Sequence, residues 1–228
     1  ALHFIMTATF LSVPQALVTD LGIASAGHWK VYLGVFLASL AGTIPLILAT
    51  ERTGRGPALF VLAILAVAVA QALLGFDHRH LWVVLGGLTL FFAGFNYLEA
   101  RLPAQLTLAA PGHERGAALG IFATAQFFGA FLGGALGGVL LGRFGLAGVF
   151  WGSAVVALGW AAVAAGTRRA QSRASRMRLP SKPASASAPC NAVRSRSGSR
   201  AWRRSTQPVK WAFVGAWPWP GLNSVLNC

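Results

Sequence analysis

Charged residues are scarce in this sequence, and acids are the scarcest of them. Only 11% of the 228 residues are charged, whereas a typical soluble domain carries about 25%. Hydrophobic residues make up 55% of the chain, and the mean hydropathy is +0.61. Because an ordinary soluble surface is rich in charged side chains, this shortage indicates a protein whose surface faces lipid.

Cysteine and the usual catalytic motifs are also lacking. Cys190 and Cys228 are the two cysteines and no histidine lies near them, so neither a disulfide framework nor a zinc spacing is present. The chain has no glycine-rich phosphate loop after a strand, no Ser/His/Asp set and no paired carboxylates on one helix face. We therefore predict that the protein is not an enzyme and has no cofactor and no metal site.

No signal peptide is recognisable at the N-terminal end. Ala1 stands inside an apolar run, with no charged region and no small-residue cleavage site ahead of it. We expect the true start of the protein to lie upstream of Ala1.

Long apolar stretches dominate residues 1–169. A spanning helix needs about 20 mainly apolar residues to cross about 30 Å of hydrocarbon, and barrel strands would be about ten residues long and alternating. We therefore predict an all-α, polytopic membrane domain of about six transmembrane helices over residues 1–169. The predicted spans are Ala1 to about Thr19, Val31–Thr50, Pro57–Phe76, Leu81 to about Leu102, Gly116 to about Leu141, and a last span from the turn Gly142–Gly145 to about Gly166.

The basic residues of the short loops are shared unevenly between the two ends of this predicted bundle. The larger set, at one end, is Arg52, Arg55, Arg101, Arg115, Arg168 and Arg169, and the smaller set is Lys30, Arg79 and Arg143. Since cytoplasmic loops carry the excess of Lys and Arg, we predict that the first end and both termini face the cytoplasm.

The last part of the chain is strongly basic. Residues 167–228 contain twelve Lys/Arg and no acid, whereas residues 1–166 contain seven Lys/Arg and all five acids. We predict that residues 170–228 form a disordered basic tail, because their Arg, Ser, Pro and Ala cannot build a core. The tail is either a polybasic segment for anionic lipid or nucleic acid or, as the Trp-Pro repeats at 217–220 favour, out-of-frame translation of a GC-rich gene.

A few polar side chains interrupt the apolar spans, and such residues usually face a bundle interior. Asn96 and Glu99 are three residues apart on the same side of one helix. Glu99 lies about 27 Å along its span at 1.5 Å per residue, so it is either a pathway or proton-carrying residue, or a rim carboxylate paired with Arg101 or Arg115. The candidate substrate-pathway residues are Gln15, Asn96, Glu99 and Gln126, and Gln71 is a further polar residue within a span.

Two other features suggest packing or turns. The fifth span repeats glycine at every fourth position in two registers, Gly129, Gly133 and Gly137 and then Gly134, Gly138 and Gly142. Small residues at this spacing let helix backbones approach closely, and the same face could slide during a conformational change.

Between the second and third spans, Glu51, Arg52, Gly54 and Arg55 form a short charged turn. His78 and His80 are interpreted as part of a solvated turn.

The loop from Glu51 to Arg55 resembles a degenerate copy of the acid-Arg-x-Gly-Arg cytoplasmic loop motif of the major facilitator superfamily. The more specific match is Phe91–Gly138, which reads FFAGFNYLEARLPAQLTLAAPGHERGAALGIFATAQFFGAFLGGALGG. This stretch is similar to helices ten and eleven of drug-efflux-like members, particularly the YajR-like branch, and residues 28–33 resemble the same branch. The tail does not resemble the small soluble domain that ends that branch.

The resemblance implies that residues 1–169 are helices seven to twelve, the C-terminal half of a transporter in a bacterial inner membrane. It implies alternating access between two six-helix halves, with spans one to three and four to six as inverted repeats. The expected partners are the lipid bilayer, a small-molecule substrate, protons, and either a missing N-terminal half or a second copy, with no nucleic acid. The implied activity is proton-coupled efflux, incomplete in this chain alone.

Two rival interpretations stay open. The chain is a self-contained six-helix membrane scaffold or oligomeric pore, or it is a membrane anchor for a lipid- or nucleic-acid-binding tail.

Overall fold

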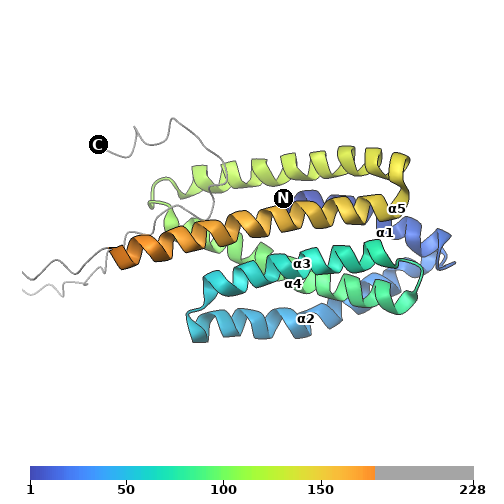
Figure 1. The fold of residues 1–228 in the computed structure, drawn as a ribbon, viewed down its shortest axis with the longest axis horizontal. Coiled ribbons are helices and arrows are strands. Elements are labelled where there is room, and N and C mark those ends of the chain that lie inside the picture. Colours follow the sequence, from blue (N-terminus) through green and yellow to red (C-terminus); the bar gives the residue numbers. More distant parts are fainter. Residues whose placement is uncertain (178–228) are drawn as a thin grey trace, which may run out of the picture.

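A bundle of long helices makes up the described part of the chain (Figure 1). The computed structural model describes the backbone of residues 1–177 and the side chains of residues 1–170. Within these residues the regular elements are α1 (Leu2–Thr19), the short 3-10 helix η1 (Ser25–Gly27), α2 (His28–Thr53), α3 (Gly56–Phe76), α4 (Leu81–Ala109) and α5 (Arg115–Met177). The predicted basic tail lies outside the described residues beyond Met177.

Five of these helices are long and apolar enough to cross a membrane, judged by length and composition. The longest, α5, consists of two helices that meet at Gly145, where φ is 67° and ψ is −167°. The ribbon reverses direction there (Figure 1), because glycine has no Cβ to oppose a positive φ. Four single helices and the two limbs of α5 give six spans, so the predicted all-α polytopic fold is confirmed.

Two helix boundaries differ from the sequence prediction. The fourth span was expected to end before Pro103, but α4 continues to Ala109. A proline lacks the N–H that would donate to the carbonyl four residues earlier, here that of Glu99, and such an interruption is tolerated inside membrane helices. The Thr107 hydroxyl donates to the Pro103 carbonyl oxygen over 2.8 Å, one helical turn back. The last helix continues past Gly166 to Met177, so residues 170–177, predicted as part of a disordered tail, are helical.

The loops alternate between the two ends of the bundle (Figure 1). The turn after α2, the loop after α4 and the end of α5 lie at one end, which we call the Gly54 end. The loops after α1 and α3 and the reversal at Gly145 lie at the other, the Gly145 end. The larger set of loop arginines therefore gathers at one end of the fold.

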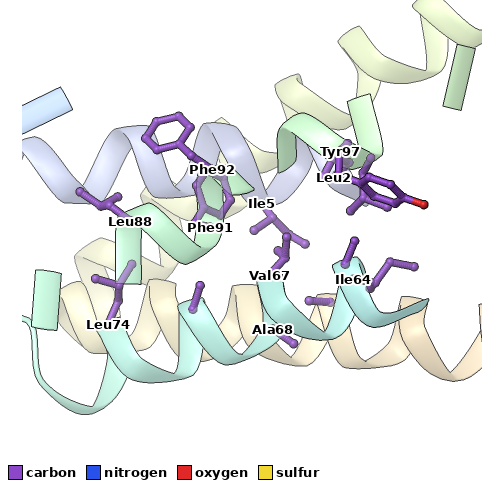
Figure 2. Close-up of a cluster of buried hydrophobic side chains, with 14 of the residues drawn as sticks. Leu2, Ile5, Ile64, Val67, Ala68, Leu74, Leu88, Phe91, Phe92 and Tyr97 are labelled. Atoms are coloured by element: carbon purple, nitrogen blue, oxygen red, sulfur yellow. The ribbon is translucent and has the colours of Figure 1, made fainter. Parts of the chain in front are cut away.

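Each helix packs mainly against one or two others. α3 lies inside the bundle against α4 and α5, α1 packs mainly against α5, and α2 packs mainly against α4. The core forms where α1, α3 and α4 meet, with Ile5, Val67 and Phe91 fully buried in it (Figure 2). α2 is the least buried of the spanning helices, so most of its surface faces outward in this chain.

Glycines permit the closest helix contacts. A Cβ added at Gly94 of α4 would lie 2.9 Å from the carbonyl oxygen of Ala63 in α3, and one at Gly133 of α5 would lie 2.3 Å from the carbonyl oxygen of Phe4 in α1. In lipid, where no hydrophobic drive brings helices together, such close backbone packing is what holds them. The α1–α5 and α3–α4 contacts therefore depend on residues without a side chain.

If spans one to three and four to six are inverted repeats, the contact between spans five and one should correspond to a contact between spans two and four. Gly133 joins the fifth span to the first at Phe4, and Gly42 joins the second span to the fourth, where its Cβ would lie 3.3 Å from the Cβ of Ala93. An axis relating spans one to three with four to six would map each contact onto the other. The pseudo-two-fold relation stays a prediction.

We expect Gly133→Ala to destabilise the fold by about 1–3 kcal/mol, the usual cost of overpacking, because the new methyl group would collide with the α1 backbone. Gly138 lies on the same helix with open space around its Cβ position, so Gly138→Ala is the matched control. Melting temperatures of the two purified variants in detergent make the comparison. Equal melting temperatures would show that the α1–α5 contact is looser than described.

Candidate functional site

A carboxylate, an amide and an imidazole from three different spans meet, partly exposed, where α1, α4 and α5 come together. Gln126 of α5 donates from Nε2 to Oε1 of Glu99 in α4 over 2.9 Å. His3 of α1 lies on the other side, with Nε2 at 3.9 Å from Glu99 Oε2. Sequence reasoning predicted Glu99 and Gln126 separately, and the fold brings them into contact.

The Glu99 carboxylate is only half satisfied. Oε1 accepts the hydrogen bond from Gln126, whereas Oε2 is buried and has no hydrogen-bond partner within the described part of the chain. The 3.9 Å to His3 exceeds hydrogen-bond length. The suggested pairing with Arg101 or Arg115 is not among the ion pairs of the described residues. Glu99 Oε2 is therefore a buried acceptor without a donor, a state that costs free energy among apolar side chains.

Asn96 extends this set of polar side chains toward α2. Its Nδ2 donates to the Ser39 hydroxyl over 3.3 Å, and one turn further along α2 the Thr43 hydroxyl lies 3.3 Å from the Ala93 carbonyl oxygen of α4. We define the polar strip as His3, Ser39, Asn96, Glu99 and Gln126. Its members come from four spans, and Ser39 is fully buried whereas the other four are partly exposed.

An aromatic group adjoins the polar strip. The Phe10 ring stacks on Tyr32 with centroids 5.8 Å apart, and Phe92 makes edge contacts with Phe10 at 6.0 Å and with Phe36 at 6.1 Å. The hydroxyl oxygen of Tyr32 is buried and has no hydrogen-bond partner within the described residues. We call Phe10, Tyr32, Phe36 and Phe92 the aromatic group.

A shallow hollow lies beside this group. Its empty volume is about 160 Å³ including the open mouth, and it is lined by Thr9, Phe10, Val13, Tyr32, Leu88, Phe91 and Phe92. The Phe92 ring points away from α3 (Figure 2), so the aromatic group lies on the side of α4 opposite the α3 contact.

The other two polar residues of the spans have different surroundings. Gln15 is exposed and its side chain makes no hydrogen bond among the described residues, so it lies apart from the polar strip. Gln71 is fully buried and donates from Nε2 to the Thr9 hydroxyl over 2.8 Å. Gln71 therefore ties α3 to α1 in the core.

The predicted loop motif forms an exposed turn at the Gly54 end. Glu51, Arg52 and Arg55 are exposed, and no ion pair of the described residues includes them. Gly54 ends α2 with φ of 62°, a conformation that favours glycine at a helix C-terminus.

The two glycine registers of the fifth span have different surroundings. Gly129, Gly133 and Gly137 face α1, whereas the Cβ positions of Gly138 and Gly142 meet open space and Gly134 has one contact at 3.6 Å with Thr7. One stripe therefore packs and the other stays largely open in this chain.

Histidine and aspartate pairs stand at the Gly145 end. His78 Nε2 lies 3.5 Å from Asp20 Oδ2, and the His80 ring contacts the Asp77 carboxylate. The His78–Asp20 pair joins the loop after α3 to the end of α1, whereas the His80–Asp77 pair lies within one loop. No group of three or more metal-binding side chains gathers among the described residues.

Sequence reasoning missed His3 and the aromatic group. An ionisable residue within an apolar run was the available signal for His3. The aromatic group has no comparable signal, because phenylalanines on spans far apart in sequence become neighbours only through packing.

We expect the Gln126–Glu99 hydrogen bond to couple the stabilities of α4 and α5. In a double-mutant cycle with Gln126→Leu and Glu99→Leu, the coupling should be about 0.6–1.7 kcal/mol, the range of interhelical hydrogen bonds in membranes. Unfolding free energies in detergent measure it. Thr124→Ala, two residues earlier on the exposed side of α5, should show no coupling to Glu99→Leu, and zero coupling for Gln126 would refute the contact.

Comparison with known proteins agrees with this architecture. The family model described as Major Facilitator Superfamily matches residues 1–226. The inner membrane transport protein YajR of Escherichia coli is 36% identical over 163 residues, which cover 72% of this chain and 36% of that protein. An uncharacterized transporter of Buchnera aphidicola from Acyrthosiphon pisum is 28% identical over 132 residues, 58% of this chain and 34% of that protein.

A second uncharacterized transporter, from Buchnera aphidicola of Baizongia pistaciae, is 25% identical over 161 residues, 70% of this chain and 41% of its own length. The chain thus spans about a third to two fifths of the length of these relatives. The predicted resemblance to the superfamily is confirmed, and the chain belongs to the major facilitator superfamily.

Proposed function

We propose that this chain forms the C-terminal half of a secondary transporter that exports small molecules in exchange for protons. The observation that carries the proposal is the polar strip, in which His3, Glu99 and Gln126 meet between apolar spans. Polar and ionisable groups are costly inside a bilayer and mark pathways for ions and substrates. Membership of this superfamily favours transport over catalysis.

The proposal of a half follows from length and from the nature of the site. The chain covers 36% of the E. coli relative, and the Phe91–Gly138 sequence resembles helices ten and eleven of drug-efflux-like members of the superfamily. Alternating access uses a site between two halves. The polar strip and the aromatic group are partly exposed in this chain, as one wall of such a site would be.

Glu99 is the acid best placed to carry a proton. Of the five acids, Asp20 and Asp77 follow the ends of α1 and α3, and Glu51 lies in the last turn of α2. Glu114 stands in the loop between α4 and α5. Glu99 alone lies well inside a helix, with one oxygen unpartnered within the described residues.

We further propose that the protein resides in a bacterial inner membrane with the Gly54 end in the cytoplasm. Six arginines lie toward that end, in its loops or in the helix segments next to them, against Lys30, Arg79 and Arg143 toward the Gly145 end. The positive-inside rule favours this orientation.

We expect the chain alone, purified and reconstituted in vesicles, to show no efflux of a fluorescent cationic dye in response to an imposed proton gradient, because half a site cannot alternate between two sides. Co-reconstitution with the N-terminal half of the E. coli relative should produce gradient-dependent efflux. Glu99→Gln should lower that rate at least tenfold, whereas Leu37→Ala, an exposed neutral change on α2, should not.

Gradient-dependent efflux by the chain alone, abolished by Glu99→Gln, would show that it is self-sufficient as an oligomer. The proposal of a half would then be wrong. Ion flux without dye dependence would favour the rival interpretation of an oligomeric pore.

The orientation has its own test. In a Cys190→Ser/Cys228→Ser background, Phe144→Cys should react with a membrane-impermeant maleimide in intact cells, because Phe144 is exposed at the Gly145 end. Thr53→Cys, exposed beside Gly54, should react only after the cells are permeabilised. The opposite labelling pattern would reverse the proposed topology.

A further inference from the structure

A partly buried arginine lies at the junction where α2 ends and α3 begins. A Cβ added at Gly56, the first residue of α3, would lie 3.4 Å from Nη2 of Arg101 in α4 and 3.4 Å from Cγ2 of Thr50 in α2. One turn earlier on α4, the Tyr97 hydroxyl forms a hydrogen bond of 2.8 Å with the Thr50 hydroxyl. Arg101 is therefore held against the start of α3 by contacts from three helices.

The guanidinium of Arg101 has no partner within the described residues. Its Nε atom is buried and forms no hydrogen bond, and the ion pairs of these residues do not include Arg101. Its two Nη atoms are not buried, so they can meet a ligand. A partly buried cation without a partner costs free energy, and this one also adjoins the positive end of the α3 helix dipole. An anion bound at this junction would lower both costs.

The turn between α2 and α3 adds exposed positive charge. Arg52 and Arg55 are both exposed and take part in no ion pair of the described residues, and the same holds for Glu51, the acid of this turn. We call Arg52, Arg55 and Arg101 the arginine group. Because a guanidinium binds phosphate oxygens through two parallel N–H bonds, the arginine group suits a phosphate.

An apolar stripe runs along α3 from the same junction. All the exposed side chains of α3 are apolar, and they are Pro57, Leu62, Leu65, Val69, Leu73 and Phe76. From Leu62 onward they are three or four residues apart, which places them on one side of the helix. The polar strip has no member on α3, so the exposed side of α3 is suited to contact lipid rather than a polar substrate.

We propose that the arginine group binds the phosphate of an anionic phospholipid whose acyl chains lie along the exposed stripe of α3. The two features adjoin at Gly56, so one molecule with a phosphate at one end and hydrocarbon at the other meets both. The lipid would belong to the leaflet at the Gly54 end. This inference does not depend on the proposed transport function.

The net charge of the headgroup decides which phospholipid fits. A zwitterionic headgroup carries an amine beside its phosphate, and three arginines with one neighbouring acid would repel that amine. A headgroup that ends in hydroxyl groups keeps the full negative charge of the phosphate. A free phosphate ion would meet the arginine group without covering the apolar stripe, so we expect it to compete poorly with the lipid.

Native mass spectrometry of the full chain in detergent tests the proposal with two probes, dioleoyl phosphatidylglycerol and dioleoyl phosphatidylcholine. Both carry the same acyl chains and one phosphate, but only the first has a net negative charge. Phosphatidylglycerol should bind about fivefold more tightly, the effect of one cation near an anionic headgroup. Arg101→Gln should remove most of this preference while leaving the binding of phosphatidylcholine nearly unchanged.

Arg115→Gln is the matched control. It removes the same charge from an exposed arginine at the same end of the fold, but the α4–α5 loop beside Arg115 lies on the other side of the bundle from the α2–α3 turn (Figure 1). It should leave the preference unchanged. Arg52→Gln alters only an exposed side chain of the turn, so it should lower the preference even if Arg101→Gln disturbs packing. Circular dichroism and melting temperatures show whether each variant is folded.

Three results would overturn the proposal. They are equal binding of the two lipids, a preference that survives both Arg101→Gln and Arg52→Gln, and equal losses in Arg101→Gln and Arg115→Gln. The last would show that the net charge of the chain, rather than a site, attracts the lipid. Excess inorganic phosphate should leave phosphatidylglycerol bound, and its displacement would show that the arginine group is a site for soluble phosphate instead.

Discussion

The close packing of α5 on α1 at Gly133 is the contact on which the candidate site depends. A side chain at that position would collide with the backbone of Phe4, so the two helices touch only because Gly133 has none. Phe4 is the neighbour of His3, and Gln126 lies two turns before Gly133 on α5. The same contact therefore brings Gln126 and His3 to opposite sides of Glu99, and a looser contact would separate all three.

Polar groups in lipid must find partners within the protein, and most of those in the spans do so. Serine and threonine hydroxyls of α1 and α2 donate to carbonyls of their own helices, as Thr9 does to Ile5, and Gln71 donates in turn to Thr9. Within the described residues, the exceptions in the spans include Glu99 Oε2, the Tyr32 hydroxyl and Gln71 Oε1. Buried polar atoms without a hydrogen-bond partner therefore occur both beside the polar strip and in the core around α3.

Glu99 shows how far sequence reasoning reached into the site. Its position about 27 Å along the fourth span was compatible both with a pathway residue and with a rim carboxylate held by arginine. The structure gives it an amide and an imidazole from other spans instead. Spacing along one helix could not decide this, since the partners come from α1 and α5.

The sequence by itself determined the number of spans, the turn at Gly145 and the superfamily, because lipid demands long uninterrupted apolar helices and allows few ways to end them. Helix ends at Pro103 and Gly166 were misplaced, because α4 continues through its proline and the last helix continues beyond its apolar run. Only the tertiary structure decided which faces meet. Helices that are apolar all round carry no pattern that points toward the bundle interior, so His3 and the aromatic group became part of the candidate site through packing alone.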